Sequence, residues 1–271
     1  MKKILFFCVM AGLFANCSSN EPTISTKKGI GVFSVGEMKK VTFSPGNLQY
    51  HPATDEWRFA ENQTDYIGDA NRYCSSTYNG YNGWLDLFGW STGANFGVST
   101  STSNGDYYSG SFVDWGTNTI SNDEPNTWRT LSDDEWYYLL NTRTNAINLR
   151  GVAQVNGVNG LIFLPDNWVC PEGITFKSGF HSSYGVYYYA AYQTFTAAEW
   201  SKLESAGAVF LPAAGGRLGS DVDYVQCNGY YWSASERNGI NAYYLYFFSD
   251  DAYMNYSFRF NGLAVRLVKD L

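Results

Sequence analysis

Apolar and polar residues alternate in short runs near the start of the chain. The runs 32–35 (Val-Phe-Ser-Val) and 41–44 (Val-Thr-Phe-Ser) have the period of two that a half-buried strand requires, and Pro-Gly-Asn follows at 45–47 as a turn signal. A third run, 57–60 (Trp-Arg-Phe-Ala), has the same character. These patterns predict two strands and a turn between residues 29 and 50, and a further short strand after them.

Two capping boxes predict two helices. Ser132 and Thr196 each stand three residues before a glutamate, Glu135 and Glu199, and an apolar run follows. A serine or threonine here accepts the N–H of the third helical residue, whose carboxylate returns to the backbone of the cap. We interpret the acids at 133–135 as helix-start residues and not as catalytic ones, because carboxylates are stabilised at the positive end of a helix dipole.

The second half of the chain carries more strand signals than the first. Residues 62–127 are rich in Asn, Gly, Ser, Thr and Tyr and predict long ordered loops. The expected fold class is α+β, with two helices, short antiparallel strands and many long loops in a single domain, 29–271, with an N-terminal β extension. The later strands are expected at 160–164, 208–211, 229–235, 242–248, 255–260 and 262–268, with a turn at 249–251.

The N-terminus has the layout of an export signal. A lysine pair precedes an apolar run, 4–14, that is too short to span a bilayer. The run ends at Leu-Phe-Ala-Asn-Cys, which is similar to a bacterial lipobox, although Asn16 departs from that pattern. We expect a lipoprotein signal peptide at 1–16, a lipidated Cys17, a flexible tether at 17–28 and a lipid anchor in a membrane. A plain signal peptide is the alternative.

Composition leaves two interpretations of the aromatic residues. The chain has 22 Tyr, 18 Phe and 9 Trp, an aromatic share of 18%, and a formal net charge of −7. The negative charge excludes a basic surface for nucleic acid, so no nucleic acid partner is expected. Tyrosine and tryptophan build cores, but they also give binding surfaces a large contact area at a small entropic cost.

Histidines and cysteines are too few and too scattered for most metal or nucleophile chemistry. The histidines are His51 and His181, and the cysteines beyond Cys17 are Cys74, Cys170 and Cys227. Their spacing fits no zinc pattern. An exported protein can form one disulfide from these three cysteines, with the pair undetermined, or keep three free thiols. We expect no metal and no cofactor.

Several motifs stand in a distinctive order along residues 30–271. They are 42–50 (Thr-Phe-Ser-Pro-Gly-Asn-Leu-Gln-Tyr), 57–59 (Trp-Arg-Phe), 83–90 (Gly-Trp-Leu-Asp-Leu-Phe-Gly-Trp), 128–131 (Trp-Arg-Thr-Leu), 161–166 (Leu-Ile-Phe-Leu-Pro-Asp), 210–215 (Phe-Leu-Pro-Ala-Ala-Gly), 230–233 (Tyr-Tyr-Trp-Ser) and 265–268 (Val-Arg-Leu-Val). This pattern resembles exported lipoproteins of gut Bacteroidetes related to the Fibrobacter succinogenes major paralogous domain. The resemblance implies the C-type-lectin-like fold of the formylglycine-generating enzyme superfamily, and an outer-membrane lipoprotein that faces the cell exterior.

The same fold and ending occur in target proteins of diversity-generating retroelements. In those proteins, adenine-rich codons near the C-terminus vary on a fixed scaffold and do not yield Lys, Glu, Gln, Met or Trp. Within residues 241–261 only Met254 lies outside the permitted set. The resemblance therefore implies a variable C-terminal region, whereas a tyrosine-rich antiparallel sheet in an ordinary paralogue is the alternative.

Enzymatic activity is not carried over by this resemblance. In the formylglycine-generating superfamily it depends on reactive cysteines in the C-terminal part, where this chain has only Cys227, without a close cysteine partner or a nearby histidine. A calcium-binding lectin would have Glu-Pro-Asn in a late loop, but residues 123–126 (Asp-Glu-Pro-Asn) precede the first helix and predict a turn. We expect that the protein is not an enzyme.

Alternation divides the late strand into two faces. Leu245 and Phe247 share a face with Tyr243 and are expected in the core, whereas Tyr244, Tyr246 and Phe248 share the other face. A register error of one residue would exchange the two sets.

The function that these patterns favour is a ligand-binding module with an unknown protein or glycan partner. Rigid aromatic side chains supply contact area, and short polar ones supply adaptable hydrogen bonds. A structural or fimbria-associated surface subunit is the alternative, and a carbohydrate-active enzyme is a weaker one. The predicted ligand-binding residues are Ser235, Glu236, Arg237, Asn238, Asn241, Tyr244, Tyr246, Phe248, Asp250, Asp251, Tyr253, Asn255, Tyr256 and Ser257.

Overall fold

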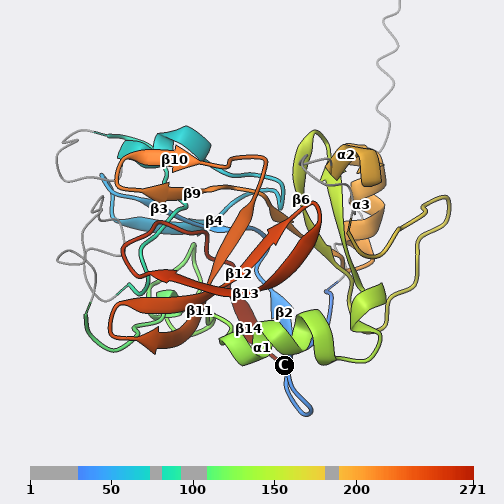
Figure 1. Cartoon of the computed structure of the whole chain (residues 1–271), viewed down its shortest axis with the longest axis horizontal. Helices are drawn as coiled ribbons and strands as arrows, with labels where there is room; N and C mark the ends of the chain where they lie inside the picture. The colour runs from blue at the N-terminus through green and yellow to red at the C-terminus, as the bar shows by residue number, and fades with distance from the viewer. Residues whose placement is uncertain (1–29, 74–80, 93–108, 181–188) are drawn as a thin grey trace, which may run out of the picture.

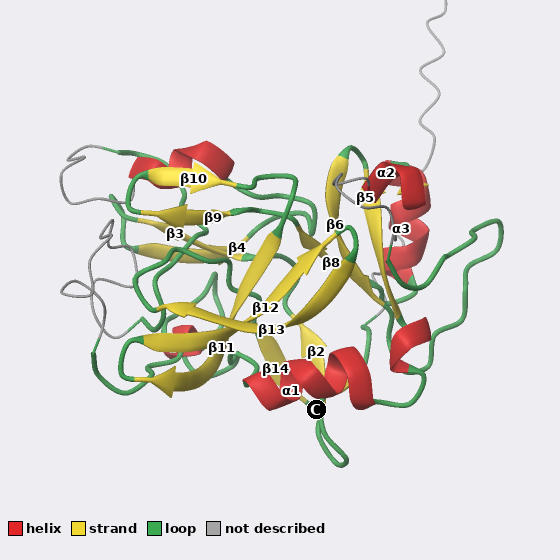
Figure 2. Cartoon of the chain, in the orientation of Figure 1, coloured by secondary structure: helices red, strands yellow, loops and turns green. Residues whose placement is uncertain are grey.

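The computed structural model describes residues 30–73, 81–92, 109–180 and 189–271. Within these ranges the chain is a mixed α+β structure of small, mostly antiparallel sheets with few helices (Figure 1, Figure 2). The expected signal peptide and tether, with the lipidation residue Cys17, lie outside the described residues, as do Cys74 and His181.

Two of the small sheets connect distant parts of the chain. The first joins β1 (Phe33–Ser34) and β2 (Lys40–Phe43) to β14 (Val268–Asp270) near the C-terminus. The second has the order β7-β5-β6-β8, in which only the β5–β7 pair is parallel. The bounds of its strands are Thr194–Phe195 (β7), Arg150–Val155 (β5), Val158–Phe163 (β6) and Val209–Pro212 (β8).

The other sheets are built from neighbouring strands. Two are hairpins, β3–β4 and β9–β10, and one is a three-stranded meander in the order β11-β12-β13. The hairpin strands are Leu48–His51 (β3), Glu56–Phe59 (β4), Gly216–Leu218 (β9) and Asp221–Asp223 (β10). The meander strands are Gly229–Asn238 (β11), Asn241–Phe248 (β12) and Asp251–Phe258 (β13).

Both predicted capping boxes are confirmed. Ser132 Oγ accepts the Glu135 N–H at 3.2 Å and Thr196 Oγ1 accepts the Glu199 N–H at 3.3 Å, and both glutamates return to the backbone of the cap. They start α1 (Asp133–Tyr137), which continues as the π-helix η5 (Tyr138–Thr142), and α3 (Ala197–Ser205). The structure adds the short helix α2 (Tyr189–Tyr192) and the 3₁₀ helices η1 (Gly68–Tyr73), η4 (Trp115–Thr117) and η6 (Ala146–Asn148).

The meander β11–β13 lies between the two ends of the molecule. Figure 1 shows α2 and α3 beside the four-stranded sheet on the right, the hairpins β3–β4 and β9–β10 on the left, and α1 below the meander. Leu245 and Phe247 of β12 are fully buried in one core cluster with Trp136 and Leu139 of α1 and η5. The predicted register of β12 is therefore confirmed for these two residues, and the meander rests on α1.

A second core cluster covers part of the other face of the meander. Trp232 and Tyr244 pack there with Trp90, Trp115 and other aromatic residues. Trp90 and Trp115 come from residues 62–127, which the sequence predicted as long ordered loops, whereas Tyr50, Trp57 and Phe59 of the same cluster come from the hairpin β3–β4. A third cluster joins α3 to the outer face of the four-stranded sheet through Trp200, Leu203 and Phe210.

Three local expectations have clear outcomes. The last strand is shorter and later than the expected 262–268, because residues 262–264 make only isolated bridges and β14 begins at Val268. Residues 123–126 form a turn, in which the Asp123 carboxylate accepts the Trp128 indole N–H at 2.7 Å. Cys170 and Cys227 are free thiols.

Candidate ligand-binding surface

Aromatic rings line one face of the meander in a contiguous row. Register aligns Tyr230 of β11 with Tyr246 of β12, and Tyr246 with Tyr253 of β13. The ring centroids of Tyr246 lie 5.1 Å from Tyr230, 5.2 Å from Tyr253 and 5.5 Å from Phe248. We call the four residues Tyr230, Tyr246, Phe248 and Tyr253 the tyrosine face.

The tyrosine face is open to solvent in part. Tyr253 is 40% exposed, and Tyr246 and Phe248 are half-buried. Aromatic pairs at these distances hold one another in place, so the exposed ring edges stand on a preordered platform. The partly exposed rings can therefore contact a ligand without first changing their positions.

Tyr244 departs from its predicted role. It is only 7% exposed, and its ring packs against Trp232 at 6.0 Å and Tyr230 at 5.8 Å. Burial accordingly raises the pKa of its hydroxyl above the ordinary value. Alternation placed Tyr244 on the correct face, but the second core cluster covers that end of the face, so Tyr244 belongs to the core.

Polar residues of β13 flank the aromatic rings. Asp251, Asn255 and Ser257 pair with Phe248, Tyr244 and Ala242 of β12. Paired residues share a face of the sheet, so these three lie on the face of the tyrosine row and alternate with the residues that face α1. Asp251 is exposed, and the other two are partly exposed. The Ser257 hydroxyl accepts the Asn261 amide at 2.7 Å, and the Asp250 carboxylate in the preceding turn accepts the Ser249 hydroxyl at 2.8 Å.

A second exposed cluster lies on the opposite face, near the β11–β12 turn. The Arg237 guanidinium lies 3.2 Å from the ring centroid of Tyr256, whose ring contacts Tyr243 at 6.4 Å. Tyr256 is 44% exposed and Phe258 is 42% exposed. We call Arg237, Tyr243, Tyr256 and Phe258 the tip patch. Tyr243 is half-buried and belongs to none of the three core clusters, contrary to expectation.

The predicted site residues are thus divided between two faces of one sheet. Tyr246, Phe248, Asp251, Tyr253, Asn255 and Ser257 belong to the face of the tyrosine row, whereas Arg237 and Tyr256 lie behind it. Residues of β13 contribute to both. A ligand can therefore contact both sets only by passing around the edge of the sheet.

Three other residues that the sequence predicted as ligand contacts hold the hairpin of β11 and β12 in place. Glu236 pairs with the buried Arg259 at 2.9 Å, and Arg259 also donates to the Asn238 carbonyl at 2.7 Å and stacks over Trp90 at 4.3 Å. The Asn238 side chain accepts the N–H groups of Ile240 and Asn241 across the turn. Glu236, Asn238 and Asn241 consequently have framework roles in this structure.

Backbone atoms attach the meander to the rest of the molecule. The Trp232 N–H donates to the Ala264 carbonyl at 3.0 Å, and the Ala234 N–H donates to the Leu131 carbonyl at 2.9 Å. The Trp90 indole donates to the Ser233 carbonyl at 2.9 Å. These bonds fix β11 and, through it, the position of β12 and β13.

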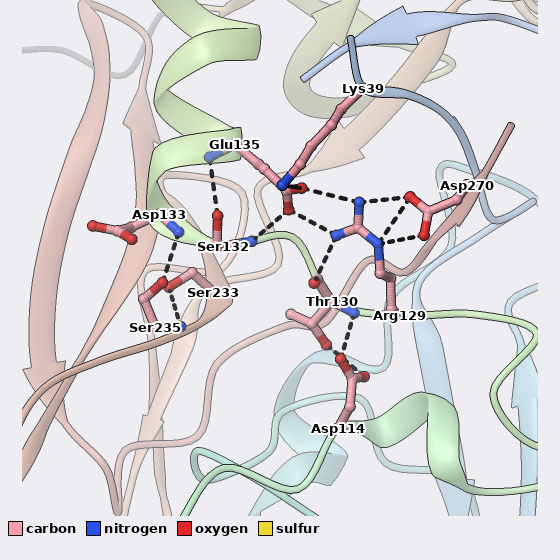
Figure 3. A network of polar contacts seen from close by, with 10 residues as sticks. All are labelled: Lys39, Asp114, Arg129, Thr130, Ser132, Asp133, Glu135, Ser233, Ser235 and Asp270. Carbon is pink, nitrogen blue, oxygen red and sulfur yellow. Dashed lines mark hydrogen bonds and ion pairs between the residues drawn. The ribbon is translucent and has the colours of Figure 1, made fainter. Parts of the chain in front are cut away.

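Figure 3 shows how the start of α1 is held against β11 and β14. The Asp133 N–H donates to the Ser235 hydroxyl at 3.0 Å, so Ser235 is also a framework residue. Arg129 binds the Glu135 carboxylate with bonds of 2.7 and 3.0 Å and the Asp270 carboxylate with bonds of 2.7 to 3.0 Å. No local pattern predicts the Arg129–Asp270 contact, because 141 residues separate its two members.

Charge pairing in this network sets the protonation of its acids. Burial opposes ionisation of Glu135, but hydrogen bonds from Arg129 and the Ser132 backbone outweigh it and lower the pKa. Hydrogen bonding to Arg129 also lowers the pKa of Asp270. Both acids are therefore carboxylates at neutral pH, and the network is a structural clamp.

Two cavities lie away from the meander. One is a groove of about 540 Å³ beside α3, lined by residues that include Cys170, Lys202 and Ser205. The other is a cleft of about 190 Å³ between β1–β2 and the end of α3, lined in part by Gln63 and Glu204. Residues of β11–β13 line neither of these two cavities.

The described residues contain no group of three or more His, Cys, Asp or Glu side chains that could hold a metal ion.

Comparison of the chain with protein-family models, curated proteins and solved structures finds no match. None of the helices in the described ranges is long and apolar enough to cross a membrane.

Proposed function

We propose that the protein is a surface-displayed lipoprotein that binds a protein or glycan ligand through the tyrosine face and the adjoining residues of β13. The observation that carries this proposal is the row of Tyr246, Phe248 and Tyr253, which is ordered by ring contacts and yet open to solvent in part. Exposed aromatic residues on a rigid support bind with little loss of side-chain entropy.

The proposal includes the C-type-lectin-like fold and the anchor at Cys17 in the outer membrane, both of which rest on the resemblance of the sequence. The mixed α+β architecture agrees with the class to which such a fold belongs. It further includes variation of the C-terminal strands by a retroelement. Sequencing the locus in sister strains tests this point: differences concentrated between residues 235 and 261 support it, and an even spread along the gene contradicts it.

Binding is tested with a Tyr246→Ser, Tyr253→Ser double variant. The purified wild-type protein is applied to a glycan array and to a phage-displayed random-peptide library, and retained ligands are measured on each variant. Tyr137→Ser is the matched control, since Tyr137 is 54% exposed on α1, away from the tyrosine face. We expect the double variant to lose at least about ten-fold in affinity and the control to lose little.

Two outcomes would overturn the proposal. One is that every retained ligand binds the double variant as well as it binds the wild-type protein, which would exclude the tyrosine face. The other is that neither library yields a ligand above the level of an empty surface. Melting temperatures of all variants are measured in parallel, and we expect them to stay close to the wild-type value because the substituted rings are exposed in part.

A further inference from the structure

The outer edge of β13 is a free sheet edge among the described residues. β13 pairs with β12 along its whole length, from Asp251 to Phe258, and it is the last strand in the order β11-β12-β13. An edge strand presents N–H and C=O groups of alternate residues to the side that has no partner. Residues Tyr253 to Phe258 of this edge are exposed or partly exposed, whereas Ala252, beneath the Asp251 side chain, is only 5% exposed. Six residues are long for an exposed edge, since protected edges are usually short.

Side chains of β13 cover two of these edge amides. The Ala252 N–H donates to Asp251 Oδ1 at 2.7 Å, and the Tyr256 N–H donates to Asn255 Oδ1 at 2.8 Å. Both donors belong to even-numbered residues, as alternation requires for groups that point away from β12. Each amide is thus satisfied by the residue before it and not by a strand.

Exposed aromatic residues flank the same edge on both sides. Tyr253 belongs to the tyrosine face, and Tyr256 and Phe258 belong to the tip patch behind it. A ligand seated on the edge can contact both groups, whereas a ligand lying flat on one face reaches only one. The edge is therefore the position that unites the two exposed clusters.

We propose that the ligand is an extended polypeptide segment of a partner protein, which adds to β13 as a fourth strand. This inference rests on the proposed function and names its ligand class. Added strands gain affinity from main-chain hydrogen bonds and specificity from alternate side chains, which here would meet Tyr253 on one face and Tyr256 on the other. A glycan has no regular array of amides and carbonyls to match the edge.

The side chains of Asp251 and Asn255 act as removable caps in this scheme. While they hold the Ala252 and Tyr256 amides, the edge is disfavoured for pairing with a second copy of the chain, which also carries a net charge of −7. A bound strand replaces each cap with a carbonyl. Removing a cap should tighten peptide binding about five-fold, because the peptide no longer has to break the hydrogen bond between the cap and the edge amide.

The test uses peptides from the library whose binding is lost in the Tyr246→Ser, Tyr253→Ser double variant. Each peptide is resynthesised with a backbone N-methyl group at every position in turn. We expect methylation at every second residue to weaken binding at least about ten-fold and methylation between them to have little effect, because only alternate amides face β13. Asp251→Ala and Asn255→Ala should each bind about five-fold tighter, and Asp250→Ala, which removes the same charge beside the edge, should not.

Each other outcome overturns the edge inference and separates it from the proposed function. Tyrosine-dependent peptides that tolerate every N-methyl group, or tyrosine-dependent glycans alone, would exclude strand addition and leave the proposed function standing. If no ligand depends on Tyr246 and Tyr253, both the edge inference and the proposed function are contradicted. If light scattering shows that the Asp251→Ala, Asn255→Ala double variant dimerises and no longer binds peptide, the occupant of the edge is a second copy of the chain.

Discussion

The Arg129 guanidinium donates to both carboxylate oxygens of Glu135, at 2.7 and 3.0 Å, and thereby fixes the start of α1. Glu135 is 8% exposed. Replacement of Arg129 by Leu would remove the bidentate cation of this buried carboxylate and leave it the more distant, exposed Lys39 ammonium at 3.5 Å. We therefore expect a loss of roughly 2 kcal/mol in the free energy of unfolding, measured with urea.

Arg72→Leu is the control for this substitution. Arg72 and Asp69 form an exposed pair at 3.5 Å, and its loss should cost less than about 0.5 kcal/mol. The difference between the wild-type protein and Arg129→Leu should also shrink in acid. Because the folded pKa values of Glu135 and Asp270 are lowered, their contribution is present above the unfolded values and is lost as the pH falls through the folded ones. Equal losses in both variants would contradict the clamp.

Asp86 should give the opposite pH dependence. Burial raises its pKa from 3.8 to about 6, against hydrogen bonds from Asn71 and the Ile67 backbone. The folded state therefore binds the proton more tightly than the unfolded state, and stability falls as the pH rises from 3.8 through 6. Asp86→Asn stays neutral, so its stability relative to wild type should increase by about 3 kcal/mol across that interval. A difference that does not change with pH would contradict the raised pKa.

Gly229 and Gly239 stand in and next to β11 but should respond differently to alanine. A Cβ atom on Gly229 would lie 2.0 Å from the buried Phe247 ring, whereas a Cβ atom on Gly239 would meet nothing within 4 Å. Gly229→Ala should lower the free energy of unfolding by about 3 kcal/mol through overpacking. Gly239→Ala should change it by less than about 0.5 kcal/mol. Calorimetry of the two variants decides whether β12 packs on β11 as described.

Glu236→Ala tests whether Glu236 supports the hairpin of β11 and β12 or contacts a ligand. Loss of its bond to the buried Arg259 should lower stability by about 1 kcal/mol and speed hydrogen exchange at the Ile240 and Asn241 amides. Glu61→Ala removes an exposed carboxylate elsewhere and should do neither. If hydrogen exchange is unchanged but ligand binding is lost, Glu236 is a ligand contact and not a support of the hairpin.

Cys17→Ala tests the lipid anchor. The variant should lose labelling by palmitate and leave the membrane fraction, because a protein without acyl chains has no anchor of that kind. Cys170→Ala is the control, since Cys170 is an exposed free thiol of the folded part and its loss should leave labelling intact. Continued labelling of Cys17→Ala would contradict the lipobox interpretation.

Local signals in the sequence predicted several elements correctly. The spacing of Ser132 and Thr196 from their glutamates gave both helix starts, because a capping box is contained within four residues. Alternation in β12 gave the buried side of Leu245 and Phe247, because the period of a strand is set by its own backbone.

Features that depend on distant partners could not be predicted in this way. Tyr244 is buried in a core cluster that includes Trp90 and Trp115, and nothing near Tyr244 in the sequence indicates that cluster. The framework roles of Glu236 and Ser235 depend on Arg259 and on the start of α1, respectively. Alternation could separate the faces of the sheet, but only the packing of other segments decides which part of a face stays open.

The attachment of β11 through backbone atoms has a consequence for how this surface can evolve. Carbonyl and amide groups are the same in every residue except proline, so the bonds of Trp232 N, Ala234 N and the Ser233 carbonyl survive most substitutions at those and neighbouring positions. New side chains on β12 and β13 can therefore be sampled without rebuilding their support. Mutational tolerance is thereby located in the same strands as the proposed ligand contacts, which makes this sheet an evolvable surface.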